Sequence, residues 1–393
     1  MTERDAARDV ALVLSGGSVN GVMMELGFLR RLRTSPLWPR VGWIFGTSAG
    51  ALAGTMAALD RLDDLERFLL AMQAHDAFRP HRLWRLPLLG SHEYRLPDTI
   101  DERLGGVHGL AVELTESPIE LIVCATDVTD TTGGDDPGDY ELVYSSRSTE
   151  PDVMAQAILA SGAISTLVMP LRVGERIATD GGWLRNYPLA HAYHRPGVEL
   201  IVAFRYLPRY SPFDPTPLAT IRRRLGRFSR VPPVRALIEE LKEAEAREAR
   251  GEPAHLLDMI TRLMRIAVLR ASVLEERAAD EKDAGIEALA RLREEVDDAI
   301  RRGVSDPHER ERVTAAVAER FGDAHFPFGR DRHVPRITVR ASAQGVSLEP
   351  QSRTPAPWSE EDKRELIARG WALTDEALAD AGADQPRKVA QSR

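Results

Sequence analysis

Ser48 lies in the stretch GTSAG, residues 46–50, with Gly46 and Gly50 two residues to either side. The apolar run VGWIF precedes it and the small residues ALAGTMAAL follow, a pattern that predicts a strand, a sharp turn and a helix. Such a turn places the hydroxyl at a helix N-terminus, where unpaired N–H groups favour the negative charge of acyl transfer. Larger residues than glycine would collide with the strand and helix. Ser48 is therefore a candidate nucleophile, with an ordinary tight turn as the alternative.

A second glycine-rich stretch, LVLSGGSVNGV, follows the first predicted strand. Gly16 and Gly17 leave backbone N–H groups unobstructed, and Gly21 opens a predicted helix, which suits either a phosphate loop or an oxyanion hole. The spacing of Gly16, Ser18 and Gly21 breaks the dinucleotide fingerprint at its second glycine, and no P-loop lysine follows. We therefore favour an oxyanion hole beside Ser48.

A serine hydroxyl is a weak nucleophile without a base, and Asp180 in IATDGGWLRNYPL is the candidate. It ends a strand-like run and precedes Gly181 and Gly182, so its carboxylate is expected at the carboxyl end of a strand, where α/β sheets place their sites. The alternative is a turn aspartate of the kind common before glycine.

The composition bounds the class of protein. The 393 residues are 43% hydrophobic, and 52 basic against 60 acidic residues give a net charge of -8, which offers no bulk attraction to nucleic acid. No apolar stretch reaches the roughly 18 residues of a membrane span, and MTERDAARDV lacks the layout of a signal peptide. We expect a cytoplasmic protein with Cys124 in its core, no metal site and no cofactor.

Short apolar runs alternate with helical patterns up to about residue 205, which predicts an α/β domain with a largely parallel sheet. Charged, Ala-, Glu- and Arg-rich helical patterns then follow, before a late strand, RITVRASA, and a helix with Ser359 as its N-cap. One domain with a helical insertion and two separate domains are both compatible with this order. The predicted divisions are 8–205 (catalytic core), 206–330 (helical region), 331–383 (C-terminal strand and helix) and 384–393 (tail).

Taken together, the three motifs resemble the patatin-like phospholipase family. SGGSVNG is similar to its glycine-rich motif, GTSAG to its nucleophile elbow and DGG to its aspartate motif, in the same order. ATD at 125–127, AILASGAIST at 157–166 and NYPL at 186–189 resemble the segments between them. The resemblance covers about residues 8–205 and the final strand and helix.

The resemblance implies a three-layer α/β/α fold and a Ser-Asp dyad, with Ser48 as nucleophile and Asp180 as general base. The reaction would be hydrolysis of phospholipids or other long-chain acyl esters through an acyl-enzyme, without a cofactor. The backbone N–H groups implied for the oxyanion hole are those of Gly16, Gly17, Ser18 and Ala49.

Two residues depart from the family's usual motif. Ser18 replaces a third glycine, so its side chain narrows the approach to the oxyanion hole. Asn20 replaces a basic residue, which puts the preferred substrate in doubt. The segment AISTLVMP also lacks the proline that often follows its isoleucine, a minor change.

Two other functions stay open. An α/β-hydrolase triad would need a histidine after the acid, and His191 and His194 follow Asp180 by only 11 and 14 residues. A degenerate family member would instead bind lipid or a protein partner through its helical half.

Residues 78–97 combine arginines with apolar and aromatic side chains, which predicts a lid or peripheral membrane contact, with a packed loop as the alternative. The apolar members are Phe78, Leu83, Trp84, Leu86, Leu88 and Leu89, and the basic ones Arg79, Arg82 and Arg85. A second arginine-rich run, 222–235, either contacts anionic lipid or is a solvated face paired with nearby acids. The helices after it are compatible with homo-oligomer formation.

Overall fold

The structure is a computed structural model of the chain. It describes residues 8–81, 92–129, 134–165, 167–207, 222–223, 225–250, 252, 256–323, 333–343, 346, 348 and 357–383.

The described residues form one eight-stranded sheet and one small hairpin. The strands are β1 (Val10–Leu14), β2 (Val41–Thr47), β3 (Phe78–Pro80), β4 (His92–Tyr94), β5 (Glu120–Asp127), β6 (Glu141–Ser145), β7 (Leu171–Val173), β8 (Arg176–Asp180), β9 (Leu200–Tyr206) and β10 (Arg336–Ala341). Strands β10, β9, β1, β2 and β5 lie side by side and run parallel. Strands β6 and β8 pair antiparallel with β5, β7 pairs antiparallel with β8, and β3 and β4 form the hairpin.

The helices connect and cover these strands. The α-helices are α1 (Ser18–Arg33), α2 (Ala49–Ala58), α3 (Leu62–Ala71), α4 (Ala74–Ala77), α6 (Leu96–Leu104), α7 (Val107–Glu116), α8 (Pro151–Ser161), α9 (Gly182–Arg185), α10 (Leu189–His194), α12 (Pro232–Ala249), α13 (Leu256–Gly303), α14 (Pro307–Asp323) and α15 (Glu360–Asp380). Short 3-10 helices are η2 (Trp38–Arg40), η4 (Pro137–Tyr140) and η5 (Gly226–Phe228).

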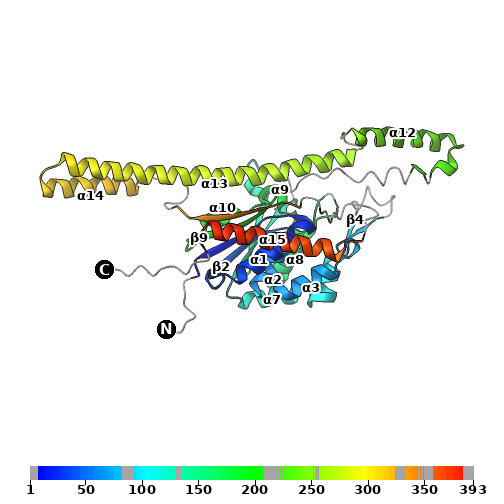
Figure 1. Ribbon diagram of the computed structural model, residues 1–393, viewed down its shortest axis with the longest axis horizontal. Helices are drawn as coiled ribbons and strands as arrows, with labels where there is room; N and C mark the ends of the chain where they lie inside the picture. The colour runs from blue at the N-terminus through cyan, green and yellow to red at the C-terminus, as the bar shows by residue number, and fades with distance from the viewer. Residues whose placement is uncertain are drawn as a thin grey trace.

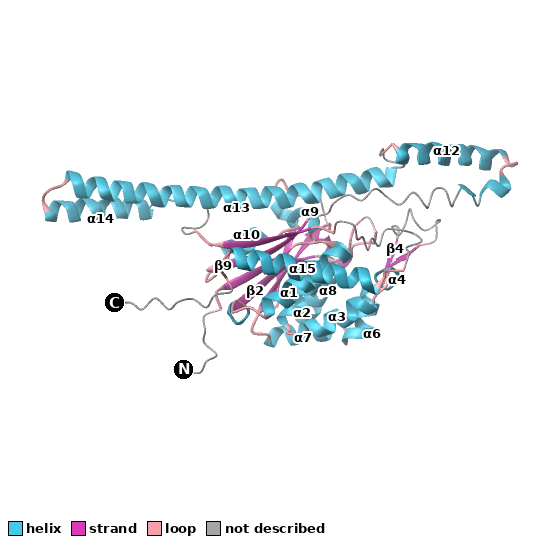
Figure 2. Cartoon of the chain, in the orientation of Figure 1, coloured by secondary structure: helices cyan, strands magenta, loops and turns pink. Residues whose placement is uncertain are grey.

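Strand β1 shows why the sheet needs helices on both faces. All five of its residues, VALVL, are buried, as expected of a parallel strand covered on both sides. Val10, Leu12 and Leu14 pack with the core under α1, α2 and α8, whereas Ala11 and Val13 pack with α10 and Ala279 of α13. The predicted three-layer α/β/α fold with a largely parallel sheet is therefore confirmed, and Figure 2 shows the strands between the two helical layers.

Helices α1 and α15 touch backbone to backbone. A Cβ atom at Gly27 of α1 would lie 2.0 Å from the carbonyl oxygen of Ile367, and one at Gly370 would lie 2.0 Å from that of Met24. Ser359 caps α15 as predicted, because its side chain accepts a hydrogen bond from the Asp362 N–H over 3.0 Å. The C-terminal helix is thus fixed against the first helix of the chain.

The helical region α12–α14 lies between β9 and β10 in the chain, and β10 returns to pair with β9. Figure 1 shows α13 running along one face of the sheet and beyond it, with α14 beside its C-terminal end and α12 at its N-terminal end. In the arginine-rich run, Arg222 pairs with Glu245, whereas Arg224 lies outside the described residues. No helix within the described ranges combines the length and the apolar character that crossing a membrane requires.

The predicted membrane-contact segment 78–97 is described only at its two ends. Residues 82–91, which include Trp84, lie outside the described residues. Phe78 and Tyr94 stack on each other across the β3–β4 hairpin, with ring centroids 5.7 Å apart. Phe78 is buried and lines a pocket, which at this position fits the packed-loop alternative rather than a membrane contact.

Candidate active site

Ser48 and Asp180 are brought together by two strands that end against each other. Cys124 of β5 pairs with Thr47 of β2, and the next residue, Ala125, pairs with Asp180 of β8. Because β6 occupies the opposite edge of β5 over both positions, β2 and β8 must share one edge. They approach from opposite directions, so their carboxyl ends meet beside β5. Asp180 ends a strand, as we predicted, but that strand runs antiparallel, not parallel, to β5.

The Ser48 backbone has the strained geometry of a nucleophile elbow. Its φ is 56° and its ψ is -118°, a region that residues other than glycine rarely adopt. A Cβ at Gly46 would lie 2.4 Å from the carbonyl oxygen of Gly50, and one at Gly50 would lie 2.5 Å from that of Leu14. Both glycines are therefore required by close backbone contacts. The Ser48 N–H donates to Ser161 Oγ over 2.8 Å, which holds the turn.

Asp180 accepts the hydrogen bond of the serine directly. Ser48 Oγ donates to Asp180 Oδ2 over 2.7 Å, and the Gly182 N–H donates to Oδ1 over 2.6 Å. Thr126 Oγ donates to the backbone oxygen of Asp180 over 2.9 Å and fixes the strand end. Burial raises the pKa of the Asp180 carboxyl to about 6, although the bonds from Ser48 and Gly182 oppose the shift. A carboxyl with this pKa is ionised at neutral pH and is still basic enough to accept a proton.

Two further glycines of the motifs are fixed by close backbone contacts. A Cβ at Gly17 would lie 2.6 Å from the Cα of Gly21, and one at Gly181 would lie 2.3 Å from the carbonyl oxygen of Cys124, so neither position tolerates a side chain. Gly21 itself would admit a Cβ at ordinary contact distances.

The predicted set of oxyanion donors needs one correction. The Gly16 N–H already donates to the carbonyl oxygen of Asn186 over 2.8 Å, so it is committed to holding the loop. Ser18 and Ala49 are the first residues of α1 and α2, whose first-turn N–H groups have no partner within their own helices. Both residues line the same pocket as Ser48, so two helix N-termini converge on it.

The two departures from the family motif have different structural consequences. Ser18 has a φ of 54° in the left-handed region and lines the pocket beside Ser48. Asn20 is buried, and its Oδ1 accepts a hydrogen bond from the Leu348 N–H over 2.9 Å. Asn20 therefore anchors a C-terminal segment to the start of α1.

An apolar pocket opens at Ser48. Its walls come from α1, α2, α3, α8 and the β3–β4 hairpin. Apolar side chains that line it include Val19, Val22, Leu52, Leu69, Met72 and Ile158. Tyr94 also lines it, with its hydroxyl committed to the carbonyl oxygen of Leu159 over 3.0 Å. The pocket thus offers apolar contacts next to a polar reaction centre.

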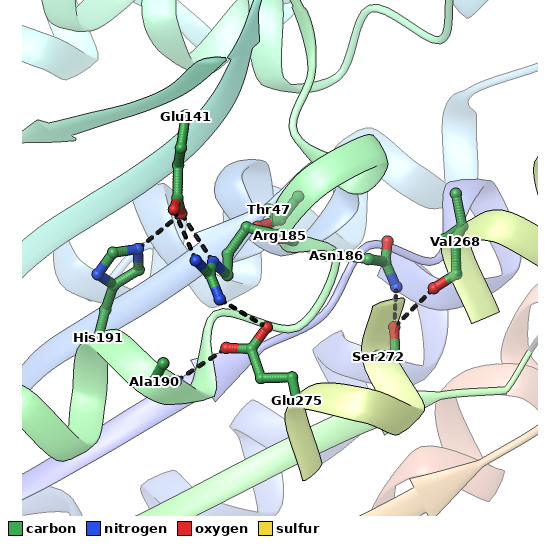
Figure 3. A network of polar contacts seen from close by, with 9 residues as sticks. All are labelled: Thr47, Glu141, Arg185, Asn186, Ala190, His191, Val268, Ser272 and Glu275. Atoms are coloured by element: carbon green, nitrogen blue, oxygen red, sulfur yellow. Dashed lines mark hydrogen bonds and ion pairs between the residues drawn. The ribbon is translucent and has the colours of Figure 1, made fainter. Parts of the chain in front are cut away.

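His191 takes part in a different network from that of Ser48. Its Nε2 lies 2.7 Å from Glu141 Oε1, and Arg185 donates to both oxygens of the same carboxylate over 2.8 and 2.7 Å (Figure 3). Burial would raise the pKa of Glu141, but His191 and Arg185 lower it to about 2. Ser48 donates directly to Asp180, whereas His191 is engaged with Glu141.

Cys124 is buried in the core, as predicted, and burial raises the pKa of its thiol. Its Sγ and side-chain atoms of Glu141 and His191 lie within 4.8 Å of one another, a cluster that the sequence spacing did not reveal. The Arg185 guanidinium occupies both oxygens of Glu141, so the protein supplies its own cation there.

Several residues that shape the site were not identified as functional from the sequence. Ser161, Thr126 and Asn186 lie inside the connecting segments AILASGAIST, ATD and NYPL, so the motif resemblance was the signal that could have pointed to them. Tyr94 lies inside the predicted segment 78–97, but its place in the pocket had no signal of its own, because only the fold brings the hairpin there. Ser272 and Glu275 of α13 reach the loop after Asp180 from about 90 positions away in the chain.

Three comparisons with known proteins gave different results. No curated protein sequence matches this chain. The crystal structure of VipD from Legionella pneumophila is similar with a TM-score of 0.39 and 14% identity, over 95% of this chain and 66% of that chain. This chain thus spans about 66% of the length of VipD. Residues 12–193 match the family model described as patatin-like phospholipase. The matched part of the chain holds Ser48 and Asp180 and is similar to the patatin-like phospholipase family.

Proposed function

We propose that this protein is a serine lipid acyl hydrolase, of the phospholipase A or esterase type, that works through a Ser48–Asp180 dyad. The observation that carries the proposal is the 2.7 Å hydrogen bond from Ser48 Oγ to Asp180 Oδ2 at the mouth of an apolar pocket. The match of residues 12–193 to the patatin-like phospholipase family supports lipid hydrolysis at the level of the family.

In the first half of the reaction, Ser48 Oγ attacks the ester carbonyl carbon and its proton passes to Asp180. The carbonyl oxygen becomes an oxyanion that faces the N-terminal N–H groups of α1 and α2. Each well-placed donor of this kind contributes about 3 kcal/mol to transition-state stabilisation. The intermediate then collapses, the ester C–O bond breaks, and the leaving alcohol takes the proton from Asp180.

In the second half, Asp180 accepts a proton from a water molecule, whose oxygen attacks the acyl-enzyme carbonyl. Collapse of this intermediate breaks the bond to Ser48 Oγ, which recovers its proton from Asp180, and releases the carboxylic acid. The carboxylate is suited to both steps because the Gly182 N–H orients one oxygen while the other faces Ser48.

The pocket supports a substrate with a hydrocarbon chain. Burial of apolar surface contributes about 0.8 kcal/mol per methylene group, so a long acyl chain gains affinity in the pocket that a short one lacks. We therefore expect kcat/KM for uncharged acyl esters to rise with chain length.

Hydrolysis kinetics of the full chain test the proposal. Ser48→Ala and Asp180→Asn should each lower kcat/KM by about a thousandfold or more, because each removes a group that takes part in bond making. Asp127→Asn is a matched control, since Asp127 is a buried aspartate at a neighbouring strand end that bonds to Thr129 and Arg176. Equal activity of Asp180→Asn and wild type, both folded, would contradict the dyad.

A further inference from the structure

Residues 181–190, the segment that follows Asp180, are held between the sheet and helix α13. On the sheet side, Thr47 Oγ donates to the carbonyl oxygen of Arg185 over 2.7 Å. Glu141 of β6 accepts two hydrogen bonds from the guanidinium of the same arginine. Thr47 immediately precedes Ser48, so this segment is tied to the nucleophile as well as to Asp180.

On the other side, two residues of α13 contact the segment (Figure 3). Ser272 Oγ accepts a hydrogen bond from Asn186 Nδ2 over 3.0 Å and donates to the Val268 carbonyl oxygen of its own helix over 3.1 Å. One turn later, Glu275 Oε1 accepts from the Ala190 N–H over 2.8 Å, and Oε2 pairs with Arg185 over 3.2 Å. Ser272 is only 2% exposed, so water does not compete for its bond.

The segment that α13 contacts is itself bonded to the glycine-rich loop and to Asp180. The Asn186 carbonyl oxygen accepts the Gly16 N–H, and a Cβ at Gly16 would lie 2.4 Å from Asn186 Oδ1, so Asn186 packs directly on the glycine-rich loop. At the other end of the segment, the Gly182 N–H donates to Asp180 Oδ1 over 2.6 Å. Movement of the segment would disturb the oxyanion loop and the base together.

We infer that Ser272 and Glu275 of α13 are positioning residues for the reaction, which makes the helical region a working part of the active site. They hold residues 181–190 so that Asn186 orders the glycine-rich loop and Gly182 orients Asp180. This inference rests on the proposed function for its catalytic consequence.

Helix α13 also docks through contacts that do not reach this segment, and these provide the control. Glu276 pairs with Arg205 and Arg340 on β9 and β10. Further along, Asp283 accepts a hydrogen bond from Tyr193 over 3.0 Å. If α13 only stabilised the fold, substitutions at any of these contacts would affect catalysis to a similar extent. If Ser272 and Glu275 are positioning residues, substitutions at these two residues should affect catalysis most.

The test compares full-length wild type with Ser272→Ala, Glu275→Gln and the matched control Asp283→Asn. Hydrogen–deuterium exchange of peptides covering residues 14–21 and 181–190 is the first readout, because it does not depend on activity. We expect faster exchange in both peptides for Ser272→Ala and Glu275→Gln, and wild-type exchange for Asp283→Asn.

Kinetics with an uncharged acyl ester are the second readout. We expect kcat to fall about 10- to 100-fold in the two positioning variants, with KM within about twofold of wild type, as for small misplacements of reacting groups. The midpoint of the acidic limb of kcat/KM should also move to higher pH, because weakening the Gly182 bond destabilises the Asp180 carboxylate. Among the described residues, Ser48 and Gly182 make the bonds of this carboxylate, and Tyr94 is the titratable group that interacts with it.

The outcomes separate the two proposals. If wild type hydrolyses the ester and the two variants match Asp283→Asn in exchange and in kcat, the positioning role is overturned. If wild type hydrolyses no ester, the proposed function fails, and the exchange of residues 14–21 and 181–190 still decides whether α13 holds them. Glu275→Gln keeps the shape of the side chain, so it remains informative if Ser272→Ala does not fold.

Discussion

Ser48 and Asp180 meet because β2 and β8 end against each other on one edge of β5. The register places Ser48 one residue beyond the Thr47–Cys124 pair, level with Ala125, whose own partner is Asp180. The contact is thus determined by strand pairing rather than by flexible loops. This rigidity suits the proposed Ser48–Asp180 dyad, which requires the two side chains to stay within hydrogen-bond distance.

The pH dependence of hydrolysis should report the carboxyl of Asp180. Burial raises its pKa to about 6, and the base must be ionised to accept the serine proton. We expect kcat/KM for an uncharged ester to rise about tenfold per pH unit below pH 6 and to level off above it. The His191→Ala, His194→Ala double variant should keep the same midpoint, and a profile without an acidic limb between pH 4.5 and 8 would contradict the assignment.

Replacing Asp180 should stabilise the protein while inactivating it. The pKa is about 6 in the folded state against an ordinary value of 3.8, so the folded state binds the proton more tightly than the unfolded chain. The stability from this group is present below about pH 4 and is lost as the pH rises through about 6, by up to about 3 kcal/mol. Asp180→Asn should therefore raise the free energy of unfolding at pH 8 much more than at pH 4, as measured by denaturant titration. An equal effect at both pH values would argue against an ionised, buried carboxylate.

Ser18→Gly should relieve backbone strain at the pocket. Ser18 has a φ of 54°, which costs an L-residue about 1–2 kcal/mol and costs glycine almost nothing. After subtraction of the greater chain entropy of glycine, we expect a gain of about 0.5–1 kcal/mol in stability. The smaller residue also opens the approach to Ser48, so kcat/KM for a bulky ester should increase. Ser18→Ala, which retains the strain, is the control, and the idea fails if both variants have the same melting temperature.

The crossing of α1 and α15 should be intolerant of a single methyl group. Gly370→Ala would place a Cβ 2.0 Å from the Met24 carbonyl oxygen, so the helices must separate, at a cost of about 2–4 kcal/mol. Gly109→Ala, within α7, meets no atom within 4 Å and should stabilise the protein by up to about 1 kcal/mol. Thermal unfolding of the two variants should therefore shift in opposite directions.

Filling the pocket should change the preferred chain length. Leu52 lines the pocket from α2, and Leu52→Trp adds bulk where the acyl chain is expected. We expect the rate for a ten-carbon ester to fall about tenfold relative to a four-carbon ester, in keeping with the discrimination that apolar pockets achieve. Val112→Trp adds an indole at a residue that is 45% exposed on α7 and should leave the ratio unchanged. An unchanged ratio in Leu52→Trp would contradict the binding of the acyl chain in this pocket.

Local sequence patterns predicted much of the fold and the central pair of residues. The apolar runs correspond to buried strands, and Gly46, Gly50 and Gly181 lie where close backbone contacts exclude a side chain, so both features leave a local sequence pattern. The sequence did not indicate that β8 is antiparallel to β5, because a strand that ends in Asp180 has the same residue pattern in a parallel and in an antiparallel pairing. The sequence also did not indicate that the Gly16 N–H, which we predicted as an oxyanion donor, instead donates to the carbonyl oxygen of Asn186.

The structure of the helical region was predicted less completely than that of the sheet. Its charged, amphipathic segments correctly predicted helices, but not that α13 is a single helix of 48 residues. The acids on its docking face resemble those of a solvated surface, and only the fold shows that Glu275 and Glu276 meet arginines of the catalytic part. These long-range ion pairs form because β9 and β10, the strands before and after the helical region, pair with each other in the sheet. A local sequence pattern does not indicate that pairing.

Intact-mass analysis after reaction with a fluorophosphonate tests whether Ser48 is the nucleophile. We expect one covalent adduct on wild type and on the His191→Ala, His194→Ala double variant, assigned to Ser48 by peptide mass, and no adduct on Ser48→Ala. Each variant must first show wild-type secondary structure by circular dichroism. An unlabelled wild type, or an adduct that persists on Ser48→Ala, would contradict the assignment of Ser48 as the nucleophile.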